Sequence, residues 1–158
     1  MTTDQLKESS RSTFKAELAA AVVAALSAAL LTSLVNLSNQ HRVNPLTYLR
    51  LTLLATAAYL VAASLLHFFW PTSFRRVIPN WILISPLGSL IFVIVQLTPG
   101  VIRGGLDPLR LEPTWSEYLL NEMDAAKSVV LVLSAITLPV TGLAYYLIRR
   151  MAPKMRTR

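Results

Sequence analysis

The stretch Asn44–Arg76, NPLTYLRLTLLATAAYLVAASLLHFFWPTSFRR, carries an apolar run over residues 46–70 with a boundary signal at each end. Asn44 is a favourable N-cap, and Pro45 suits the first helical position, where its missing N–H has no partner to lose. At the far end Pro71 stops a helix. Twenty-five residues at 1.5 Å each reach about 37 Å, which exceeds the roughly 30 Å hydrocarbon core of a bilayer. The stretch therefore predicts a transmembrane helix.

The composition places the whole chain in a membrane. Of 158 residues, 54% are hydrophobic and only 15% are charged, and the mean hydropathy is +0.52. A soluble domain has roughly 25% charged residues. The length allows a single transmembrane domain over residues 1–158, and the absence of cysteine excludes disulfides and thiolate metal sites. The basic residues flank apolar runs instead of alternating with aromatics, so we expect the bilayer, and not nucleic acid, as the partner.

Three further apolar runs complete the predicted fold. The four predicted spans cover residues 18–37, 46–70, 81–98 and 127–148. The third span has two possible starts, because Asn80 can cap a helix that begins at Trp81, whereas Ser85 can cap one that begins at Pro86. The fold class is an all-α integral membrane protein with four transmembrane helices.

Alanines repeat at four-residue spacing in the first span. Two such rows are present, one formed by Ala20, Ala24 and Ala28 and the other by Ala21, Ala25 and Ala29. Small residues at this spacing allow another helix to approach closely. We expect the first helix to be the main packing surface of the bundle.

The outer loop, residues 99–126, contains one amphipathic segment. Thr114 and Glu117 have the spacing of a capping box, which marks the start of a helix. One face of that helix carries the apolar side chains of Trp115, Tyr118, Leu119 and Met123. The pattern predicts an outer interfacial helix between the third and fourth spans, running on into the fourth.

Charge counting orients the bundle. With four spans, both termini lie on the same side of the membrane. Ten basic residues are then on that side: Lys7, Arg11, Lys15, Arg75, Arg76, Arg149, Arg150, Lys154, Arg156 and Arg158. The other side receives five: Arg42, Arg50, Arg103, Arg110 and Lys127. The positive-inside rule then puts both termini in the cytoplasm, in a plasma or inner membrane.

His67 is the candidate cofactor ligand, since a histidine near a helix end with aromatic neighbours can bind haem or a chlorophyll-type pigment. His41 falls on the opposite side of the membrane, so the two histidines cannot ligate one haem within a subunit. The rival interpretation is an interfacial anchor, and the aromatic residues that follow His67 favour it.

Catalysis has little support in the sequence. No Asp, Glu, Lys or His lies in the interior of a predicted span, away from its ends, and Glu17, which precedes its span by one residue, is expected to be hydrated. The chain lacks a phosphate-binding glycine loop, a nucleophile elbow and an HExxH motif. The outer carboxylates do not have calcium-loop spacing, so no metal site is predicted. We expect a protein that is not an enzyme.

Four polar residues fall near the midpoints of the four spans: Ser27, Tyr59, Ser89 and Thr137. Tyr59 most needs a partner, because Ser and Thr can return a hydrogen bond to their own helix and a phenol usually cannot. We expect its hydroxyl to face the bundle and to donate to one of the other three or to a carbonyl near a proline. The alternative is that Tyr59 faces a partner subunit or tilts toward an interface.

These features predict a non-enzymatic accessory or structural subunit of a larger membrane protein complex, with lipid and other membrane subunits as partners. The alternative is a small homo-oligomeric transporter or channel, in which Pro86 and Pro139 are hinges. A third reading is a haem or pigment carrier that uses His67. No residue set in the sequence specifies a reaction or a ligand.

Overall fold

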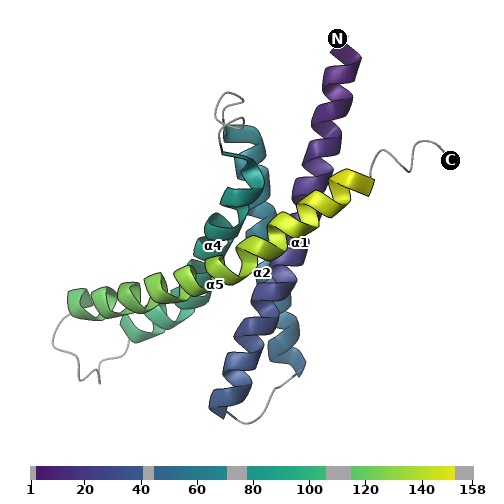
Figure 1. Cartoon of the computed structure of the whole chain (residues 1–158). Helices are drawn as coiled ribbons and strands as arrows, with labels where there is room; N and C mark the ends of the chain where they lie inside the picture. Colours follow the sequence, from purple (N-terminus) through teal and green to yellow (C-terminus); the bar gives the residue numbers. More distant parts are fainter. Residues whose placement is uncertain (1–2, 41–44, 71–77, 106–114, 152–158) are drawn as a thin grey trace.

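The computed structural model describes residues 3–40, 45–70, 78–105 and 115–151, and this part of the chain is helical and contains no strand. The helices are α1 (Thr3–Gln40), α2 (Pro45–Phe69), α4 (Asn80–Gly105) and α5 (Trp115–Met151) (Figure 1). Each contains a segment long and apolar enough to cross a membrane, namely Ser12–Val35, Pro45–Phe69, Asn80–Thr98 and Ala126–Met151. The prediction of four apolar helices of spanning length is confirmed.

The helix ends follow local sequence signals in α2 and depart from them in α4. α2 begins at Pro45, as expected for proline at a first helical position. α4 begins at Asn80 and continues through Pro86, so the later start at Pro86 is excluded. Asn80, however, does not act as the expected cap, because its side-chain nitrogen and oxygen are buried without a hydrogen-bond partner among the described residues. The Pro79 carbonyl accepts the Ile82 N–H instead, at 3.0 Å.

α1 and α5 are both longer than the spans predicted within them. The polar residues 3–17 continue α1 as a helical extension. In the same way, residues 99–105 extend α4, while residues 115–126 form one unbroken helix with the fourth apolar segment.

The alanine rows of α1 lie in the centre of the bundle. Ala20, Ala21, Ala24, Ala25, Ala28 and Ala29 are all completely buried. α1 contacts α2, α4 and α5, so the prediction that it is a packing surface is confirmed, but α4 also contacts the three other helices. The absence of side-chain bulk on α1 lets the other helices approach its backbone closely.

Two glycines allow close approach elsewhere in the bundle. A Cβ atom on Gly88 of α4 would lie 2.6 Å from Cδ1 of Tyr59, so the tyrosine ring of α2 lies directly on the α4 backbone. A Cβ atom on Gly142 of α5 would lie 2.8 Å from Cζ3 of Trp81. Trp81 also stacks on Tyr145, with ring centroids 6.3 Å apart, and these contacts join the start of α4 to the last turns of α5.

The helix ends alternate between the two ends of the bundle. In Figure 1, α1 starts and α5 ends toward the upper side of the view, whereas α1 ends and α2 starts toward the lower side. Both ends of the described chain therefore point the same way, as an even number of spans requires.

Candidate functional site

A cluster of buried hydroxyl groups lies where α2, α4 and α5 meet. The Tyr59 hydroxyl is 2.8 Å from Oγ of Ser89 and donates to Oγ1 of Thr137 at 3.4 Å. Thr137 in turn donates to the carbonyl of Leu133 in its own helix, at 2.7 Å. Tyr59, Ser89 and Thr137 are completely buried. An unpaired hydroxyl in an apolar interior costs several kcal/mol, so mutual pairing is what makes this burial tolerable.

Ser85 extends this cluster along α4. Ser85 is completely buried, and its single hydroxyl proton has two acceptors within hydrogen-bonding distance, Oγ1 of Thr137 and the carbonyl of Ser134, which is 3.1 Å away. We call Tyr59, Ser85, Ser89 and Thr137 the hydroxyl cluster. Sequence reasoning missed Ser85 as a member, although its position one turn before Ser89 places both on the same face of α4.

Ser27 is the one predicted mid-span residue that stays outside the hydroxyl cluster. Its Oγ donates to the carbonyl of Val23 at 2.9 Å, within α1. A serine in a helix can satisfy itself in this way, so its depth in the membrane does not oblige it to reach another helix. Three of the four residues predicted at one depth are thus brought together, and α1 contributes none of them.

A second polar contact joins α1 to α2. Oε2 of Glu17 lies 3.1 Å from Nδ1 of His67. The side chain of Glu17 is 4% exposed and that of His67 is 15% exposed. The expectation that Glu17 is hydrated is therefore wrong. The sequence held a signal for its burial, because Glu17 lies four residues before Ala21 and continues the buried row that Ala21 begins.

Aromatic rings enclose this contact. The ring of Phe14 lies 4.2 Å from that of His67, centroid to centroid, at an interplanar angle of 37°. Phe68 is edge-on to His67, with centroids 5.6 Å apart. His67 is thus held between two aromatic side chains and a carboxylate, in a setting more enclosed than that of an interfacial anchor. We call Glu17, His67 and Phe14 the acid–histidine site.

A groove of about 520 Å³ opens between α1, α4 and α5. Leu31, Thr32 and Val35 of α1 line it, together with Phe92, Val93, Gln96 and Leu97 of α4 and residues of α5 between Ala126 and Ile136. Its walls are almost entirely apolar. Thr32, Gln96 and Ser128 are the polar residues that line it. Nε2 of Gln96 is itself buried and has no hydrogen-bond partner in the described part of the chain.

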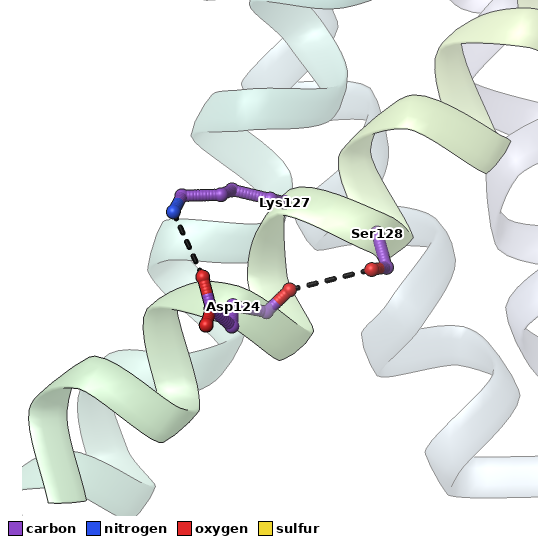
Figure 2. Close-up of polar contacts among 3 residues, drawn as sticks. All are labelled: Asp124, Lys127 and Ser128. Atoms are coloured by element: carbon purple, nitrogen blue, oxygen red, sulfur yellow. Dashed lines mark hydrogen bonds and ion pairs between the residues drawn. The ribbon is translucent and has the colours of Figure 1, made fainter. Parts of the chain in front are cut away.

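Polar groups at one end of the groove are already paired (Figure 2). Ser128 Oγ donates to the backbone carbonyl of Asp124 at 3.3 Å, and Nζ of Lys127 lies 2.8 Å from Oδ1 of the same residue. Figure 2 shows both contacts on the segment of α5 that leads into its apolar part. Lys127 and Asp124 are exposed and are not among the residues that line the groove.

The predicted interfacial face is only partly visible. Met123 is 56% exposed. The side chains of Trp115, Tyr118 and Leu119 lie outside the described residues, although the backbone there belongs to α5. The amphipathic character of this segment therefore stays a prediction.

Comparison with known proteins adds no relative: no protein family model, no curated protein and no solved structure matches this chain.

Proposed function

We propose that this protein is a non-enzymatic accessory or structural subunit of a larger membrane protein complex. One observation carries the proposal, namely that the hydroxyl cluster joins α4 to α5 next to both of their mid-span prolines. Ser85 directly precedes Pro86, and its partner Thr137 lies two residues before Pro139. The polar groups at these positions are used to hold the helices together, which is the property a rigid scaffold needs.

The same contacts argue against a transporter or channel built on proline hinges. Broken helices in transporters expose backbone groups that bind the substrate or the coupling ion. Here the Ser134 carbonyl accepts a hydrogen bond from Ser85, and motion of α4 against α5 at this depth would break that bond. The homo-oligomeric transporter is therefore the weaker proposal.

The proposed subunit is inserted with both termini on the cytoplasmic side of a plasma or inner membrane. The ten-to-five asymmetry of basic residues supports this orientation. The first part of α5, residues 115–126, is proposed to lie at the outer surface as an interfacial helix. Its exposed Met123 and the capping-box spacing of Thr114 and Glu117 support that placement. Lipid and neighbouring membrane subunits are the proposed partners.

Purification from the native membrane in a mild detergent, followed by mass spectrometry, tests this function. Larger membrane subunits are expected to co-purify in fixed ratio to the chain. A matched purification in a harsher detergent, which strips weakly bound subunits, should lose them while the chain stays folded. Recovery of the chain alone, as a defined homo-oligomer, would favour the transporter and overturn the proposal.

A haem or pigment carrier is a second candidate, and the acid–histidine site is the observation that favours it. Histidines that ligate metals usually donate their other ring N–H to a carboxylate, which fixes the tautomer and the ring orientation. Glu17 stands in that relation to Nδ1 of His67. A visible spectrum of the natively purified protein tests this candidate. A Soret or pigment band that His67→Leu abolishes and Glu17→Gln weakens is expected, and a featureless spectrum would eliminate it.

A further inference from the structure

We propose that the end of the bundle that carries both chain termini binds the headgroups of anionic glycerophospholipids, with Arg149 as the principal anchor. With four spans, this end receives the ten basic residues counted above and only three acidic ones, Asp4, Glu8 and Glu17. The opposite end receives five basic and five acidic residues. The whole net charge of +7 therefore lies at one end, where it attracts anionic lipid.

The cations that the structure describes at this end are not neutralised by the protein. Lys15 of α1 and Arg149 and Arg150 of α5 are exposed. None of the three forms an ion pair within the described part of the chain. Glu17, the carboxylate nearest to Lys15 in the sequence, contacts His67 instead. The positive charge of these side chains is therefore available to an external anion.

These cations lie at the depth of the lipid phosphates. Arg149 is about 16 Å along the α5 span from the midpoint of that span, and Lys15 is about 13 Å along the α1 span from its midpoint, at 1.5 Å per residue. The hydrocarbon core extends about 15 Å from the centre of the bilayer. Long basic side chains can extend outward from such positions into the headgroups. A lipid phosphate reaches them at this level, whereas a water-soluble acidic protein would have to enter the headgroup layer.

The contact between α4 and α5 positions Arg149. Gly142, Tyr145 and Arg149 follow one another at spacings of three and four residues, so they share one face of α5. Gly142 leaves room for Trp81 of α4, whose ring stacks on Tyr145. The Tyr145 hydroxyl in turn accepts a hydrogen bond from Nη1 of Arg149 at 3.4 Å. A guanidinium has several further N–H donors, and two of them can bind one phosphate in parallel.

Native mass spectrometry of the full-length protein in a nonionic detergent tests the proposal. The probes are phosphatidylglycerol and phosphatidylcholine with identical acyl chains, so that only the headgroup differs. Phosphatidylglycerol is expected to bind at least about tenfold more tightly, because each basic residue near an anionic surface contributes about fivefold. The preference should shrink between about 0.1 M and about 1 M salt, since the Debye length falls from about 10 Å to about 3 Å.

An exposed arginine at the opposite end of the bundle provides the matched control. Arg149→Gln should lower the preference for phosphatidylglycerol about fivefold. Arg149→Lys, which keeps the charge, should retain most of it. Arg50→Gln removes an exposed arginine near the start of α2 and should behave as the unmodified protein. Equal binding of the two lipids, or the same reduction in Arg50→Gln as in Arg149→Gln, would overturn the proposal.

The role of Tyr145 as a positioning residue has its own test. Tyr145→Phe removes the acceptor of the Arg149 hydrogen bond and should lower the preference for phosphatidylglycerol about twofold, whereas Tyr146→Phe should leave the preference unchanged. An unchanged preference in Tyr145→Phe would show that Arg149 acts as an unpositioned charge and would overturn this part of the proposal.

Two further outcomes identify another occupant. Displacement of the lipid by excess inorganic phosphate at constant ionic strength would show a site for free anions and overturn the proposal. In the mild-detergent purification, loss of a co-purifying subunit from Arg149→Gln without any change in lipid preference would show that these cations contact protein, which also overturns it. The lipid measurements use the isolated chain, so their result does not depend on whether the chain is an accessory subunit.

Discussion

Tyr59 is the residue on which the interior of the bundle depends most. Its ring lies on the backbone of α4 at Gly88, and its hydroxyl reaches Ser89 and Thr137. The apolar contact and the polar contacts are made by one side chain, so they can be separated by substitutions that remove one and keep the other.

Tyr59→Phe removes the hydroxyl and keeps the ring. We expect the free energy of unfolding to fall by about 0.6 kcal/mol, and by no more than about 1.7 kcal/mol, the range for intramembrane hydrogen bonds. The loss is small because the hydroxyls of Ser89 and Thr137 can bond to their own helices. Denaturation in mixed detergent micelles measures it, with Tyr146→Phe, which is 59% exposed, as the control. An unchanged free energy would show that the hydrogen bond contributes nothing.

Gly88→Ala adds a Cβ atom where the Tyr59 ring already lies. We expect this overpacking to destabilise the protein by about 1–3 kcal/mol. In a Tyr59→Ala background the ring is absent, and the same change should become neutral or stabilising, because alanine is the better helix former. The double-mutant cycle therefore isolates the close approach. A destabilisation that persists in the Tyr59→Ala background would contradict it.

At the scale of helices, the acid–histidine site joins the extended start of α1 to the last turn of α2. His67→Leu would leave the Glu17 carboxylate buried without this partner, so we expect a loss of about 1–3 kcal/mol in the free energy of unfolding. Adding Glu17→Leu should recover most of it, since replacing both partners with apolar residues removes the desolvation penalty.

A matched change in an exposed pair provides the comparison. Lys127→Met removes the contact with Asp124, whose side chain is 78% exposed. Exposed pairs contribute roughly 0–1 kcal/mol, so a much smaller effect is expected. Equal effects of His67→Leu and Lys127→Met would mean that burial of the acid–histidine site has no energetic consequence.

The first part of α5 provides the second prediction at this scale. If residues 115–126 lie at the membrane surface, a spin label at position 115 should be more accessible to a lipid-soluble quencher than one at position 117, because these positions fall on opposite faces of the amphipathic helix. Power-saturation spectroscopy in liposomes measures the difference. Equal access at both positions would mean that both faces of this part of α5 lie in the same environment, which contradicts an interfacial helix.

For the whole molecule, the orientation is directly testable because the chain contains no cysteine. Single cysteines at position 3, within 103–112 and at position 157 should react with an impermeant reagent in intact cells only in the middle set. Permeabilised cells, in which all three should react, are the control. Labelling of either terminus from outside would reverse the proposed topology.

The sequence alone determined the number of the apolar helices and the approximate position of each apolar segment. Transfer of a side chain into lipid depends on that residue's own chemistry, so it can be added up along the chain without knowledge of neighbours. The start of α2 at Pro45 is equally local, because proline itself restricts the backbone. The alanine rows of α1 identified a packing face for the same reason.

Only the tertiary structure decided which polar groups meet. Depth in the membrane follows from position along a helix, but contact also requires each helix to be rotated toward the right neighbour, and rotation is set by packing between residues far apart in sequence. Ser27 and Ser89 therefore have similar predicted depths, yet only Ser89 reaches Tyr59. Glu17 is buried for the same reason, because α2 brings His67 to it across 50 residues of chain.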